Sequence, residues 1–98
     1  MEFEWDEAKN ATNVRKHGFA FADGAELFQG KAPLLVAAEE DEYGEHRWRG
    51  VGMIQNRVVV VVFTERQPNL IRFISLRKAD REERQAYGQA IKDELGAH

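Results

Sequence analysis

The sequence predicts an α+β fold in which two N-terminal helices precede a four-stranded antiparallel meander sheet and a C-terminal helix follows it. Three observations support this prediction. Apolar residues recur at helical spacing near both ends, β-branched and aromatic residues concentrate between positions 46 and 77, and the connections within that region are short. With 98 residues, 43% of them hydrophobic, we expect a single domain, 1–98, with one core.

The first helix is bounded by two residues that favour helix ends. Asp6 follows a short extended start, and its carboxylate can accept hydrogen bonds from the free N–H groups of the first turn. Gly18 suits the left-handed backbone conformation that commonly ends a helix. We therefore expect this helix to run from Asp6 to about His17.

The middle of the chain predicts a second short helix and four strands. The helix is indicated by three apolar side chains at near-helical spacing, Phe21, Ala25 and Phe28. The strands are expected at residues 33–37, 46–54, 57–65 and 70–77. The connections Gln55-Asn56 and Gln67-Pro68-Asn69 are too short for a crossover, so the strands they join pair antiparallel.

The strand run 58–63 is apolar at every position, which is typical of a strand covered on both faces. We expect the N-terminal helices on one face, and the last helix or a partner protein on the other. Asp80 and Glu83 form a capping-box pattern that begins the last helix.

Charge is divided unevenly between the two halves of the chain. Residues 1–45 contain four Lys/Arg and eleven Asp/Glu, whereas residues 46–98 contain ten and six, giving the net charge of −3. The basic half can form a local positive surface on an acidic protein, and compositional scatter is the alternative. An acidic loop is expected at 39–44.

Several classes of protein are disfavoured by composition. The chain has no cysteine, so disulfides and thiolate metal sites are excluded. The run 58–63 is far too short to span a membrane, and the acidic N-terminus lacks the order of a signal peptide. We therefore expect a cytoplasmic protein that does not associate with a membrane.

A polar stripe lies on the first predicted helix. Lys9, Asn13 and Lys16 fall within about 60° of one another, with His17 adjacent. Cations near a helix C-terminus interact favourably with its dipole, which is one reason for Lys16 and His17 to be there. The alternative is a binding site. His17 has no metal-ligand spacing with the other two histidines, so we expect no metal and no cofactor.

Arginines lie along the margins of the predicted sheet. If the last hairpin pairs Arg66 with Asn69, then Arg77 lies on one face of the sheet and Arg72 on the other. A loop of different parity would exchange these faces. Arginine can clamp a phosphate through two parallel hydrogen bonds. The alternative partners are carboxylates: Glu65, Glu82 and Glu83.

Short motifs follow one another in a fixed order over residues 3–87. They are Phe3-Glu4-Trp5-Asp6, Lys9, Asn13, Lys16-His17-Gly18, Phe21, Ala25, Gly44-Glu45-x-Arg47, Gly52, the run Val59–Phe63 with Thr64-Glu65-Arg66, Ile71-Arg72-x-Ile74-Ser75-x-Arg77-Lys78-Ala79, Glu83-Arg84 and Tyr87. In this order and spacing the sequence resembles the BrnT family of type II toxin–antitoxin toxins. The resemblance implies a RelE-like fold and a metal-independent ribonuclease that arrests translation.

The resemblance also implies partners. A cognate antitoxin with a ribbon-helix-helix DNA-binding domain would neutralise the toxin, and operator DNA would be bound only through the toxin–antitoxin complex. The alternative is a non-enzymatic or decayed toxin-like module that binds a DNA-binding partner and helps to regulate transcription.

RNA cleavage without a metal needs a proton acceptor, a proton donor and positive charge near the attacked phosphorus. The catalytic candidates are Lys16, His17, Arg66, Arg72 and Arg77. The candidates for substrate binding are Lys9, Asn13, Arg47, Thr64, Ser75 and Tyr87. We expect the guanidinium groups to converge on one anion-binding hollow beside the end of the first helix.

Overall fold

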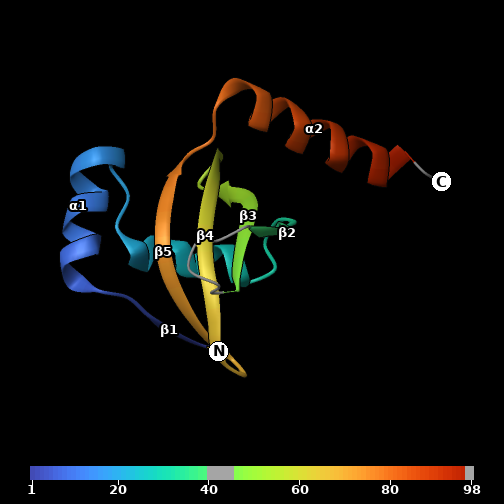
Figure 1. Cartoon of the computed structure of the whole chain (residues 1–98). Coiled ribbons are helices and arrows are strands. Elements are labelled where there is room, and N and C mark those ends of the chain that lie inside the picture. Colours follow the sequence, from blue (N-terminus) through green and yellow to red (C-terminus); the bar gives the residue numbers. More distant parts are fainter. Residues whose placement is uncertain (40–45, 97–98) are drawn as a thin grey trace.

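The computed structural model describes residues 1–39 and 46–96, so the predicted acidic loop is described only at Glu39. Its elements are β1 (Glu2–Glu4), α1 (Glu7–His17), η1 (Phe21–Phe28), β2 (Leu35–Glu39), β3 (Arg47–Ile54), β4 (Arg57–Gln67), β5 (Leu70–Lys78) and α2 (Arg81–Gly96). The described strands form a five-stranded sheet in the order β1-β5-β4-β3-β2 (Figure 1). The mixed α+β fold is confirmed, whereas the predicted count of four strands is wrong.

β1 is the strand that the prediction missed. It pairs in parallel with the first three residues of β5, and the Glu2 N–H donates to the Asn69 carbonyl at 2.7 Å. Three residues are too few to show the alternating pattern of a strand, and the partner strand lies at the other end of the sequence. The meander of β2 to β5 is antiparallel throughout, as predicted.

α1 has the predicted bounds and both predicted caps. The Asp6 side chain accepts from the Lys9 backbone N–H at 3.0 Å. Gly18 has a φ of +77°, and its N–H donates to the Val14 carbonyl. These local signals fix the length of the helix without help from the rest of the fold.

Asn13 fastens α1 to the edge of β5. Its side chain is 5% exposed, and its Nδ2 donates to the carbonyls of Leu76 at 2.7 Å and Phe19 at 2.8 Å. Its Oδ1 accepts from the Leu76 N–H at 3.1 Å. The amide thus replaces a neighbouring strand where β1 no longer covers the edge of β5.

η1 is a 3₁₀ helix, whereas the sequence indicated the residue spacing of an α-helix. Its buried residues are Phe21, Gly24 and Leu27, spaced by three, as expected for three residues per turn. The predicted contact residue Ala25 is only half-buried. Gly24 lets η1 lie close to the sheet, because a Cβ there would come within 3.1 Å of the Phe73 ring.

The core lies between η1 and one face of the sheet, which carries Val59, Val61 and Phe63. The rings of Phe28 and Phe63 meet edge to face with centroids 5.1 Å apart. Gly50 in β3 lets the Leu34 side chain pack closely on the sheet, since an added Cβ would lie 2.9 Å from that side chain.

The register between β4 and β5 differs from the one assumed above. Gln67 pairs with Leu70 around a two-residue turn, and the register shifts twice along the hairpin. Arg72 therefore pairs with Thr64 rather than lying beside Phe63. The expectation that Arg72 and Arg77 lie on opposite faces is wrong, because one shift, between Val62 and Phe63, lies between them and reverses the parity.

α2 begins with the predicted capping box. The Glu83 N–H donates to Asp80 Oδ1 at 2.8 Å, and the Asp80 N–H donates to Glu83 Oε1 at 2.9 Å. The helix then runs across one end of the sheet (Figure 1), where the Tyr87 hydroxyl donates to the Pro33 carbonyl at 2.6 Å. Within residues 1–39 and 46–96, no helix has the length and apolar character to cross a membrane.

Replacing Asn13 by alanine removes three hydrogen bonds and leaves the buried N–H and C=O of Leu76 without this partner. An unsatisfied buried polar group costs roughly 1–3 kcal/mol, so the free energy of unfolding in urea should fall by about 3 kcal/mol. Arg15→Ala, at an exposed position of the same helix, should change it by less than about 0.5 kcal/mol. Equal losses in the two variants would contradict the anchoring role of Asn13.

Candidate functional site

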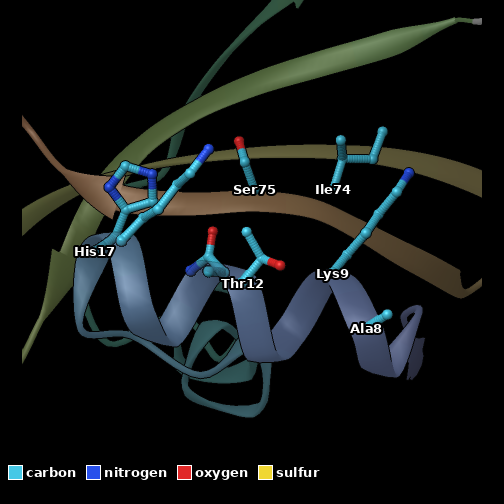
Figure 2. A pocket seen from close by; sticks show the side chains of 8 residues that line it. Ala8, Lys9, Thr12, His17, Ile74 and Ser75 are labelled. Atoms are coloured by element: carbon cyan, nitrogen blue, oxygen red, sulfur yellow. The ribbon is translucent and has the colours of Figure 1, made fainter.

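A cleft of about 330 Å³ separates α1 from β5. It is lined by Ala8, Lys9, Thr12, Asn13, Lys16, His17, Ile74 and Ser75. Figure 2 shows the side chains of Lys9, Thr12 and His17 rising from α1 toward the strand that carries Ser75. The cleft is a direct result of the Asn13 anchor, which holds the helix beside the strand.

The cleft is chemically suited to an anion. It offers two lysine ammonium groups, the imidazole of His17, and the hydroxyls of Thr12 and Ser75. No carboxylate is among the described residues that line it. Because Lys9, Thr12 and Lys16 are three and four residues apart, they project from one side of α1.

A second set of cations lies on the sheet face opposite the core, which we call the arginine face. Arg72, Ser75 and Arg77 of β5 pair with Thr64, Val62 and Val60 of β4, so they share this face. Arg49 of β3 pairs with Val62 and lies there too. Ser75 both lines the cleft and belongs to the arginine face, so the two surfaces are continuous.

The arginines of this face are paired with carboxylates. Arg77 donates to both oxygens of Glu83 at 2.7 and 2.8 Å, and Arg49 Nη1 lies 3.5 Å from the same carboxylate. Arg49 also lies 3.5 Å from Glu39. Arg72 Nη1 lies 3.5 Å from Glu4 Oε1. The alternative of arginine–glutamate pairing is confirmed for Arg77 and Glu83.

The ion pair has a large effect on Glu83. The hydrogen bonds from Arg77 lower the pKa of the Glu83 carboxyl from 4.5 to about 2, against the opposing effect of burial. Glu83 is therefore ionised at neutral pH and is a weak base, so proton transfer near neutrality falls to other groups.

Thr64 is a buried polar residue on the arginine face. It is 7% exposed, and its hydroxyl has no hydrogen-bond partner among the described residues. Such orphaned groups are uncommon in folded proteins. Its cross-strand neighbour is Arg72, but the hydroxyl oxygen itself is buried and so is closed to a ligand from solvent.

The structure brings together some of the predicted site residues and separates others. The cleft gathers Lys9, Asn13, Lys16, His17 and Ser75. The arginine face carries Thr64, Arg72 and Arg77, together with the half-buried Arg47, two residues before Arg49 on the same strand.

Arg66 and Tyr87 lie outside the cleft, and Arg66 is also far from Arg77. Arg66 is exposed near the turn between β4 and β5. Val60, the cross-strand partner of Arg77, lies six residues earlier on β4, which corresponds to about 20 Å along the strand. Tyr87 is 5% exposed, and its hydroxyl is occupied by a backbone carbonyl. The expectation that all the guanidinium groups converge on one hollow is therefore wrong.

Two residues of the site were not predicted, although the sequence held a signal for each. Thr12 lies between Lys9 and Lys16 on the same side of the helix. Arg49 follows Arg47 by two positions in a strand, so both project from the same face. Among residues 1–39 and 46–96, no three His, Asp or Glu side chains are grouped in a way that could hold a metal ion.

Comparison with known proteins identifies the family. Residues 5–83 match the family described as the ribonuclease toxin, BrnT, of type II toxin–antitoxin systems. The chain belongs to the BrnT family. The resemblance stated from the sequence is thus confirmed, and both the cleft and the arginine face fall largely within the matched residues.

A solved structure supports this assignment. The chain is similar to the Brucella abortus ribonuclease toxin, BrnT, with 29% sequence identity and a TM-score of 0.64. The match covers 83% of this chain and 99% of that chain. A search of curated proteins gives no match.

The lowered pKa of Glu83 predicts a pH-dependent contribution to stability. Because the pKa is depressed in the folded state, the contribution is complete above about pH 4.5 and is lost as the pH falls toward about 2. Because the Arg77 side chain is 37% exposed and solvent screens the pair, the contribution to the free energy of unfolding is about 1 kcal/mol. Urea denaturation should therefore show Glu83→Gln less stable than wild type at pH 7 and nearly equal to it near pH 2.

Glu82→Gln is the matched control, because Glu82 is exposed and has no ion pair within the described part of the chain. Its effect on stability should stay below about 0.5 kcal/mol at every pH. If the difference in the free energy of unfolding between wild type and Glu83→Gln does not vary with pH, the ion-pair interpretation is contradicted.

Proposed function

We propose that this chain is the toxin of a type II toxin–antitoxin system and that it cleaves RNA at the cleft between α1 and β5. Family membership supports the ribonuclease class. One observation supports this location for the active site. The cleft is lined by cations, has no carboxylate among its described lining residues, and opens at Ser75 onto the arginine face.

The proposed chemistry is an attack by the ribose 2′-OH on the adjacent phosphorus. The 2′-oxygen forms a bond to phosphorus while the bond from phosphorus to the 5′-oxygen breaks, leaving a 2′,3′-cyclic phosphate and a 5′-hydroxyl. His17 is the proposed proton acceptor, because imidazole can take a proton near neutral pH. Lys16 is the proposed donor to the leaving oxygen.

The remaining groups would bind the phosphates. Lys9 and the Ser75 hydroxyl face the proposed scissile position and stabilise its charge as the phosphorane forms. Arg72 and Arg77, on either side of Ser75 along β5, are placed to hold neighbouring phosphates. Asn13 acts as a positioning residue, since its amide is used by the backbone.

We also propose the partners and conditions that the BrnT resemblance implies. The partner is a cognate antitoxin with a ribbon-helix-helix domain, and operator DNA is bound only through the complex. Cleavage needs no metal and arrests translation. The RelE-like relationship of the fold stays a prediction.

A second candidate function is a non-enzymatic toxin-like module that binds a DNA-binding partner and co-regulates transcription. One observation favours it. Arg77 and Arg49 are already engaged by Glu83, which leaves fewer free cations to bind RNA.

Cleavage of end-labelled RNA by purified protein in excess EDTA tests the proposal. Wild-type protein should leave cyclic-phosphate ends. His17→Ala should lower the cleavage rate by about 100-fold or more, the usual contribution of one positioned proton-transfer group. Lys16→Ala should produce a loss of similar size.

Lys92→Ala and Arg66→Ala are controls, since each removes one exposed cation outside the cleft. Both should retain most of the activity. Wild-type activity in His17→Ala would remove the cleft from the mechanism. Intact RNA with wild-type protein, together with a stable antitoxin complex, would support the second candidate function.

A further inference from the structure

The Glu83 carboxylate is surrounded by donors that are themselves only partly buried. Arg77 donates to both of its oxygens at 2.7 and 2.8 Å, and Arg49 lies 3.5 Å away. The Glu83 side chain is 15% exposed, whereas Arg77 and Arg49 are 37% and 43% exposed. The carboxylate is therefore covered while both guanidinium groups remain open to solvent.

This arrangement has the form of an occupied anion site. A guanidinium group presents two parallel N–H donors, which fit the oxygens of a carboxylate or of a phosphate. Here two arginines from different strands converge on one anion. Arg77 is two residues from Ser75, at the opening of the cleft, so the site lies next to the proposed path of the RNA.

The element that supplies the carboxylate is lightly attached to the rest of the fold. α2 contacts mainly β3, and the body of the helix extends past the sheet (Figure 1). Its other attachments include the hydrogen bond from Tyr87 to the carbonyl of Pro33, which precedes β2, and the Glu83 pairs themselves. Release of the carboxylate also breaks the hydrogen bond from the Asp80 N–H to Glu83 Oε1 at 2.9 Å, so it requires a rotation of the Glu83 side chain or a movement of the first turn.

We propose that Arg49 and Arg77 form a phosphate-binding subsite for RNA and that Glu83 is a built-in competitor for it. RNA phosphate and Glu83 then exclude each other, so the apparent affinity for RNA is reduced by the fraction of molecules in which Glu83 occupies the site. The identity of the anion as RNA rests on the proposed function, whereas the competition for the two arginines does not.

Binding of a fluorescent 2′-O-methyl RNA hexamer, followed by anisotropy, separates this proposal from catalysis, because the oligonucleotide lacks the attacking hydroxyl. Glu83→Gln should bind it about tenfold more tightly than wild type or better. Glu82→Gln makes the same change in net charge without touching either arginine, and it should change the affinity less than twofold.

Two further variants sharpen the test. Arg49→Gln added to Glu83→Gln should remove most of the gain in affinity. Glu83→Asp keeps the charge but is one methylene too short to keep both hydrogen bonds to Arg77, so it should also bind more tightly. It replaces Glu83→Gln if circular dichroism shows that the glutamine variant does not fold.

Equal affinities for the Glu82 and Glu83 variants would overturn the proposal, as would a gain that survives the loss of Arg49. Cleavage of unmodified RNA is measured in parallel. If Glu83→Gln binds the oligonucleotide more tightly but wild-type protein does not cleave RNA, the proposed nuclease activity is refuted and the proposed subsite is supported. Cleavage by wild type with no gain in binding would refute the subsite and leave the nuclease standing.

Discussion

The position of the first helix depends on one side-chain amide. A sheet edge presents unpaired N–H and C=O groups, and β1 covers that of β5 for only three residues. Asn13 then supplies a donor and an acceptor to Leu76, and its second N–H reaches the Phe19 carbonyl beyond the end of α1. One residue therefore closes the edge, holds the helix and turns the chain toward η1.

Asn10 assists from the preceding turn of the same helix. Its Oδ1 accepts from the Phe21 N–H at 2.7 Å, at the first residue of η1. The two asparagines fix both sides of the loop between α1 and η1. Lys9 and Lys16 lie on the same side of α1 as Asn13, so the residue that anchors the helix also places both lysines at the cleft.

Much of the local structure was predictable because its causes are close in sequence. The caps of α1 and the capping box of α2 each involve residues three or four apart. The lysines and His17 were placed together correctly for the same reason. β1 and the 3₁₀ form of η1 were not predictable from local patterns, because β1 pairs with a strand distant in sequence and η1 packs closely against Phe73 of that same strand.

The distribution of arginines between the two sheet faces could not be settled from sequence. A change of one position in register moves a side chain to the other face, and β4 and β5 shift register twice. The shift between Val62 and Phe63 places Arg72 on the same face as Arg77. Whether arginines pair with acids also depends on how α2 packs, which no local pattern specifies.

The cleft has a consequence for how a polyanion would reach the molecule. The whole chain carries a charge of −3, whereas the lining of the cleft adds only positive and neutral groups. Charges are screened beyond about 8–10 Å at physiological ionic strength. Attraction of a polyanion to Lys9 and Lys16 therefore acts mainly over the last part of its approach, where the described lining of the cleft presents cations and no carboxylate.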